Sequence, residues 1–93
     1  MYFDDALIAL GDPTRRAVLE RLVRRPCALA DIAQHMLPVS RPAVAQHLKV
    51  LEDAGLVTCT KDGIRQFFAV DVEHLVAVRD YFNEVLGEVV QAM

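Results

Sequence analysis

The side chains best suited to chemistry share one face of an expected helix over residues 40–54. Val44, Leu48 and Leu51 fall at i, i+4 and i+7, so these apolar side chains face a core. The opposite face carries Arg41, Pro42, Ala45, Gln46 and Lys49. A glutamine can bond N6 and N7 of adenine together, an arginine can fork onto guanine or phosphate, and a lysine suits phosphate. This face therefore predicts a helix that reads the major groove of DNA.

The residues just before this helix predict a second, shorter helix joined to it by a tight turn. Residues 30–36 have helical spacing of apolar side chains, and Pro38 prevents that helix from continuing. Ser40 is a good N-cap for the next helix, and Pro42 falls within its first turn. Gly55 ends the helix as a left-handed residue. Two helices joined in this way form a helix-turn-helix.

The residues after it predict a β-hairpin. Residues 56–60 form a strand, an Asp-Gly pair lies in the turn at 61–64, and 65–70 is the return strand. The helix-turn-helix at about 30–54 and a wing at about 56–70 define the fold class. We expect a mainly α protein with a small β-hairpin wing, a winged helix-turn-helix.

Basic side chains outside the helix 40–54 are candidates for phosphate contacts. Lys61 and Arg65 flank the tip of the wing. Thr14, Arg15 and Arg16 lie at the start of an earlier helix, where exposed N–H groups favour anions. Asp12 or Thr14 caps that helix. The alternative is a helix hairpin whose basic face is simply solvated.

Charge is segregated along the chain, whose net charge is −3. Residues 13–70 carry nine Lys and Arg against five Asp and Glu, whereas residues 1–12 and 71–93 are both acidic. A basic middle between acidic ends is compatible with a central surface that faces DNA.

Length and composition predict one domain over residues 1–93 with a subunit interface. The hydrophobic fraction is 54%, which is more than a core of this size hides. The last helix, about 72–91, is apolar on more than one side and so predicts burial against a partner subunit.

No apolar run approaches the roughly 20 residues of a membrane span, and the start lacks the positive region of a signal peptide. With two isolated cysteines, we expect a reduced, cytoplasmic setting.

Histidine and cysteine form no recognisable metal or catalytic set. His35, His47 and His74 share no i, i+3 or i+4 spacing, so we expect no metal and no cofactor. We expect His47 to pack at a helix junction, Cys59 to fill a small apolar space and Cys27 to be more exposed. A thiol switch is a further hypothesis. No phosphate loop, nucleophile arrangement or carboxylate pair indicates an enzyme.

Three segments carry a resemblance to a known family. DPTRRAVLERL, SRPAVAQHLKVLEDAGLV and the wing KDGIRQFFAV together resemble the ArsR/SmtB-type winged helix repressors over nearly the whole chain. The resemblance implies a homodimer made by the first and last helices, at about 2–10 and 72–91. It also implies binding to double-stranded DNA at an inverted-repeat operator and repression of transcription. Two recognition helices would then lie about 34 Å apart, one turn of DNA.

The resemblance also assigns site residues by position. DNA contacts fall on Ser40, Arg41, Pro42, Ala45, Gln46 and Lys49, with Lys61 and Arg65 in the wing. A serine is frequent in the family where this chain has Ala45. The dimer interface is expected at Tyr2, Phe3, Leu7, Leu75, Val78, Phe82, Val85, Leu86 and Val89.

The metal-sensing motifs of the family are absent from the sequence. The segment LADIAQHM has no cysteine, and Val85 stands near the place of a later histidine that would join Asp71 and His74. The resemblance is therefore to members without a metal site. An unnamed small-molecule inducer at the dimer seam stays open. The alternative function is a winged-helix protein-interaction module without sequence-specific DNA binding.

Overall fold

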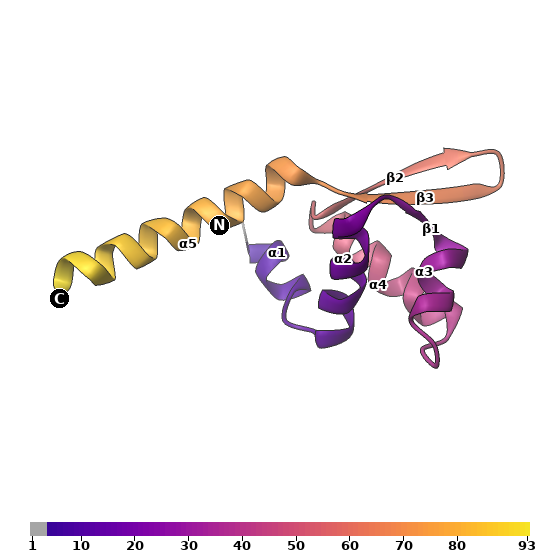
Figure 1. Cartoon of the computed structure of the whole chain (residues 1–93), viewed down its shortest axis with the longest axis horizontal. Helices are drawn as coiled ribbons and strands as arrows, with labels where there is room; N and C mark the ends of the chain where they lie inside the picture. Colours follow the sequence, from indigo (N-terminus) through magenta and orange to yellow (C-terminus); the bar gives the residue numbers. More distant parts are fainter. Residues whose placement is uncertain (1–3) are drawn as a thin grey trace.

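Helices and one small sheet make up residues 4–93, the part of the chain that the computed structural model describes. Figure 1 shows the helical body with the β-hairpin projecting from one end and the last helix from the other. The elements are α1 Asp4–Ala9, α2 Pro13–Arg24, β1 Cys27–Ala28, α3 Leu29–His35, α4 Arg41–Asp53, β2 Val57–Asp62, β3 Arg65–Val70 and α5 Val72–Ala92. The expected winged helix-turn-helix is confirmed.

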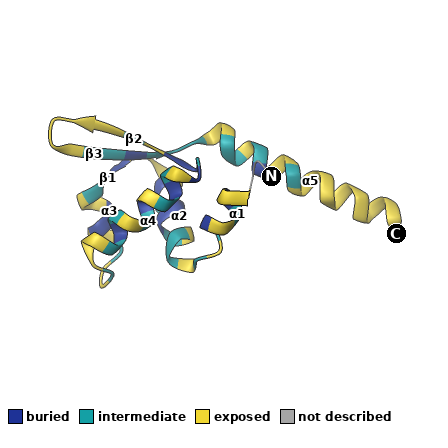
Figure 2. Cartoon of the chain, turned by 180° about the vertical axis from the view of Figure 1, so that it is seen from behind, coloured by how far each residue is buried: buried dark blue, intermediate teal, exposed yellow. Residues whose placement is uncertain are grey.

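The core lies between α2, α3, α4 and the base of the sheet, where the buried residues gather in Figure 2. Val44, Leu48 and Leu51 are completely buried, so the face of α4 expected to pack inward does so. Ile32 from α3 and Val18 from α2 complete the contacts around them. Burial of one face fixes the rotation of α4 and leaves the opposite face outward.

Both ends of α4 are capped as the sequence predicts. The backbone N–H of Ala43 donates to the Ser40 hydroxyl at 3.3 Å. At the other end Gly55 has a φ of 83°. Its N–H donates to Glu52, and the N–H of Leu56 donates to the Leu51 carbonyl at 3.0 Å. This pair of bonds is a Schellman motif, which satisfies the last carbonyls of the helix and turns the chain into β2.

The sheet is antiparallel with the order β1-β3-β2, and its first strand is a correction to the sequence analysis. We expected Cys27 to be exposed, but it is buried because β1 pairs it with Phe68. Cys59 pairs with the same phenylalanine from the other side. Two strand spacings separate the two cysteines by about 10 Å, which is too far for a disulfide.

The hairpin turn is tighter than expected. Asp62 and Arg65 pair across the strands, so only Gly63 and Ile64 form the loop. Gly63 has a φ of 63°, which fits a type II′ turn with glycine at the first central position. The Asp-Gly signal located the turn, but Asp62 belongs to β2.

Two outer elements depart from expectation. α1 begins at Asp4 in the described residues and ends at Ala9, and the expected interface residues Tyr2 and Phe3 lie outside those residues. The helical spacing of Val23 with the buried Val18, Leu19 and Leu22 would place it on the inner face of α2, yet it is 64% exposed. It lies in the last turn of α2 and lines a surface groove with Val72 and Val76 of α5.

α5 belongs to the body only at its start. Asp71 accepts a hydrogen bond from the His74 N–H at 3.1 Å and caps the helix. Val78 is buried in the core of the chain, and Leu75 packs against it, so neither offers much surface to a second chain. Beyond them the helix projects from the body, and its side chains are exposed (Figure 2). No helix within the described residues is long and apolar enough to cross a membrane.

Candidate nucleic-acid interface

The outer face of α4 presents the side chains selected from the sequence. Ser40, Arg41, Pro42, Gln46 and Lys49 are exposed, and Ala45 is half-buried between them. The Ser40 oxygen accepts the capping bond, which leaves its O–H free to donate outward. The arrangement is a short polar row on a rigid helix, with hydrogen-bond donors and acceptors at Arg41 and Gln46.

Lys49 has an acidic neighbour on the same face. Its Nζ lies 2.8 Å from Oδ1 of Asp53, one turn along the helix, and both side chains are mostly exposed. The hydrogen bond to Asp53 raises the pKa of Lys49. An exposed pair of this kind is weak because water competes for both groups. Lys49 can therefore exchange Asp53 for a phosphate.

The two basic side chains of the wing lie on opposite faces of the hairpin. Lys61 pairs with Gln66 in the ladder, whereas Arg65 pairs with Asp62. Neighbouring pairs in a sheet point to opposite faces, so the two cations cannot contact the same group. The guanidinium of Arg65 lies 4.9 Å from the centre of the Phe67 ring, a cation–π contact that restrains it.

A groove joins the wing to the start of α4. It has a volume of about 160 Å³ and is lined by Ala28, Leu29, Ala30, Arg41, Ile64, Arg65 and Gln66. Arg41 and Arg65 thus line one groove although they are far apart in sequence. The sequence analysis assigned both to DNA but gave no reason to place them together.

Ile64 is a candidate contact that sequence reasoning missed. It occupies the tip of the wing and is fully exposed. An isoleucine at the second central position of a two-residue turn is the signal that could have found it, since polar residues and glycine prevail there.

This geometry agrees with what comparison to known proteins shows. A family described as a helix-turn-helix domain matches residues 10–60. An HTH-type transcriptional regulator of Mycobacterium tuberculosis, Rv2034, is 50% identical over 76 residues, which span 82% of this chain and 70% of the relative. The arsenical resistance operon repressor of Staphylococcus xylosus is 32% identical over 86% of this chain and 72% of its own length. The crystal structure of an ArsR family transcriptional regulator, RHA00566, has a TM-score of 0.85 at 32% identity and 94% coverage of both chains.

The chain belongs to the ArsR family. The resemblance drawn from the segments around α2, α4 and the wing is therefore confirmed.

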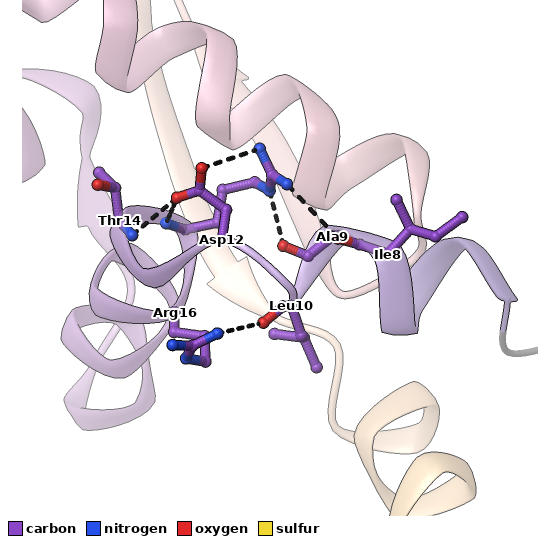
Figure 3. Close-up of polar contacts among 7 residues, drawn as sticks. Ile8, Ala9, Leu10, Asp12, Thr14 and Arg16 are labelled. Carbon is purple, nitrogen blue, oxygen red and sulfur yellow. Dashed lines mark hydrogen bonds and ion pairs between the residues drawn. The ribbon is translucent and has the colours of Figure 1, made fainter.

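One expected set of DNA contacts in this ArsR protein is engaged within the chain instead. Nε of Arg15 donates to the Ala9 carbonyl at 2.6 Å, and NH1 of Arg16 donates to the Leu10 carbonyl at 2.7 Å (Figure 3). Both arginines thus satisfy carbonyls at the end of α1, where a helix leaves such groups unpaired. Their guanidinium groups fasten α1 to α2, which explains them without DNA.

The N–H groups at the start of α2 are also occupied. The carboxylate of Asp12 accepts hydrogen bonds from the N–H groups of Thr14 at 2.8 Å and Arg15 at 3.1 Å (Figure 3). Asp12, and not Thr14, is therefore the cap. A carboxylate at this position repels a phosphate, so the structure argues against the expected phosphate contacts of Thr14, Arg15 and Arg16.

The Asp12 cap makes stability depend on acid pH. The hydrogen bond from the Arg15 N–H, with that from Thr14, holds the pKa of Asp12 below its ordinary value. A lowered carboxyl pKa contributes stability above the unfolded value, and this contribution is lost as pH falls through the folded value. We expect the wild type to have a higher Tm than Asp12→Asn at pH 7, and the difference to shrink as pH falls below the ordinary aspartate pKa of about 4 and through the lower pKa of the folded state. Thermal unfolding of both proteins across this range tests the cap, and a difference that does not change with pH contradicts it.

The described residues of this ArsR protein contain no cluster of three or more His, Cys, Asp or Glu side chains placed to hold a metal ion. His47 is half-buried on α4 and near enough to Asp12 to help lower the pKa of that carboxyl, as expected of a junction residue. His74 packs against Gly55. Cys59 is half-buried, with its Sγ 4.0 Å from the Gln66 amide nitrogen.

Proposed function

We propose that this ArsR protein is a cytoplasmic, dimeric repressor of transcription that binds an inverted-repeat operator through α4 and the wing. The observation that carries the proposal is the outer face of α4, where Arg41, Pro42 and Gln46 are exposed on a helix that is fixed by burial and capped at both ends. A helix-turn-helix protein inserts such a helix into the major groove. Relatives named as transcriptional regulators and repressors support the same reading.

The projecting half of α5 supports the dimer. Phe82, Val85, Leu86 and Val89 are each between 43% and 59% exposed and recur on one side of the helix. A second copy would cover this apolar stripe. A two-fold axis would then orient the two copies of α4 and the wing toward successive turns of DNA. Leu7 of α1 is half-buried and belongs to the same proposed interface. An inducer that binds at this seam would act by changing the distance between the two α4 helices of the dimer.

Selection of bound sequences from a random duplex library, at physiological salt, tests the function directly. We expect a dimer that enriches a two-fold symmetric site. Sedimentation of the same sample records the oligomeric state. No enrichment by an intact dimer would instead favour the protein-interaction module, which the net charge of −3 and the exposed stripe of α5 also fit.

Two substitutions are expected to separate base reading from phosphate binding. Gln46→Ala removes a side chain placed to bond a base, so it relaxes preference at one position per half-site by about 1 to 3 kcal/mol. Lys61→Ala removes a phosphate contact, so it weakens binding to every duplex and reduces the salt dependence. Competition binding with operator and scrambled duplexes at several salt concentrations measures both. If the two variants behave alike, this division of contacts is wrong.

A further inference from the structure

We propose that Arg41 and Arg65 of one protomer hold a single backbone phosphate of the DNA between them, in the groove that joins α4 to the wing. The inference rests on the proposed function and names a shared contact within it. The occupant is the sugar–phosphate chain of bound DNA.

The two arginines reach the groove from separate elements. Arg41 is the first residue of α4, next to the Ser40 cap, and Arg65 is the first residue of β3. Both line the groove of about 160 Å³. The base of α4 is fixed by the buried face of the helix, and Arg65 is restrained over the Phe67 ring. The backbone at Arg41 and the guanidinium of Arg65 are therefore placed before DNA arrives.

Neither guanidinium group is neutralised by a carboxylate. Within the described residues Arg15 pairs with Asp12, Lys49 with Asp53 and Arg79 with Asp80, and neither Arg41 nor Arg65 takes part in an ion pair. Asp62 pairs with Arg65 along the ladder, yet the two side chains form no ion pair. Two uncompensated positive charges beside one groove attract an anion.

The lining of the groove distinguishes a phosphate from a base edge. A guanidinium fork matches the oxygens of a phosphate and gains from its charge, whereas base edges are neutral. Apolar side chains from Ala28, Leu29 and Ile64 line the same groove. Charged groups beside apolar surface fit a sugar–phosphate chain, because the deoxyribose presents apolar atoms next to each phosphate.

A double-mutant cycle measured against salt tests the shared phosphate. Arg41→Ala, Arg65→Ala and the double variant are titrated with a random-sequence duplex from about 50 to 200 mM salt. Each single change is expected to weaken binding roughly tenfold for each bound protomer. Each also lowers the slope of log affinity against log salt by about 0.9 for each protomer. The double variant should add less than a further twofold, with no further change of slope.

Separate phosphates would give a different result. The losses would then multiply to roughly a hundredfold for each protomer, and the slope would fall by about 1.8, which overturns the shared contact. Both side chains are outside the core, so circular dichroism should show the variants folded. Arg65→Lys keeps the charge but loses the fork, and we expect it to recover the salt slope without the full affinity.

The wing supplies the matched control. Lys61 lies on the opposite face of the hairpin from Arg65, so Lys61→Ala and Arg65→Ala should be additive in both affinity and slope. Coupling in this control as strong as in the Arg41 and Arg65 pair would also overturn the inference. A wild-type protein that binds no duplex with a salt-dependent affinity would refute the proposed function itself, an outcome distinct from an additive cycle.

Discussion

Gly55→Ala is expected to lower the free energy of unfolding by about 2 to 5 kcal/mol. The added Cβ atom is unfavourable for two separate reasons. The first is the backbone, because Gly55 has a φ of 83°, where an L side chain is strained. The second is space, because an added Cβ would lie 2.8 Å from Cε1 and 3.0 Å from Nδ1 of His74. His74 belongs to the rigid first turn of α5, so its ring cannot move away freely.

Two other glycines separate these causes. Gly63 has a φ of 63° but no atom within 4 Å of an added Cβ, so Gly63→Ala should cost only the backbone strain of about 1 to 2 kcal/mol. Gly87 lies in α5 with open space around it, so Gly87→Ala should raise stability by about 0.5 to 1 kcal/mol. Chemical denaturation of the three variants gives the order directly. Equal losses at Gly55 and Gly63 would contradict the steric part.

The His74 ring provides a further check on the steric cause. In a His74→Ala background the added methyl group at Gly55 meets no imidazole, so the extra cost should fall toward that seen at Gly63. The consequence extends to DNA binding. Gly55 joins the end of α4 to β2 through the Schellman motif, so we expect Gly55→Ala also to weaken the DNA binding proposed for α4 and the wing.

The helix-turn-helix could be predicted from the sequence because its signals are local. Ser40, Pro42 and Gly55 specify the start and end of α4 through bonds within a few residues. The spacing of Val44, Leu48 and Leu51 fixes which face is buried. Together these features determine which side chains of α4 face outward, before any tertiary contact is known.

The errors arose where a residue's role depends on a distant part of the chain. Cys27 is buried because its two-residue strand pairs with β3 at Phe68. A strand of two residues is too short for its partner to be predicted from the sequence. The assignment of Arg15 and Arg16 to phosphate rests on their charge and stays a prediction, whereas the carbonyls that they satisfy depend on the corner between α1 and α2. The groove that Arg41 and Arg65 line likewise forms only when the fold brings the wing next to the start of α4.

The corrected roles leave a smaller and more coherent surface for DNA. The start of α2 carries the Asp12 carboxylate, so the cations that remain for phosphate are those of α4 and the wing. A net acidic chain can bind DNA with few cations when two copies act together, since each half-site then raises the effective concentration at the other. Under the proposed function, affinity for the operator therefore depends on the dimer.

Leu86→Glu is accordingly expected to raise the dimer dissociation constant at least a hundredfold and to abolish tight binding to the full operator. Leu86 is 59% exposed in the single chain, so the substitution removes nothing from the core. In a dimer it would bury an unpaired carboxylate, which costs several kcal/mol. Loss of the second copy of α4 and the wing would then lower affinity for an inverted repeat by about 10² to 10⁴-fold.

The matched control and a half-site duplex make this result specific. Gln91→Glu adds the same charge on the opposite side of α5 from the apolar stripe, so it should leave the dimer intact. Sedimentation equilibrium measures association, and titration with an isolated half-site measures binding by one copy of α4 and the wing. We expect Leu86→Glu to bind the half-site as the wild-type protomer does, because α4 and the wing are untouched. A variant that remains dimeric would place the interface elsewhere, and one that loses half-site binding would show that α5 supports α4 and the wing themselves.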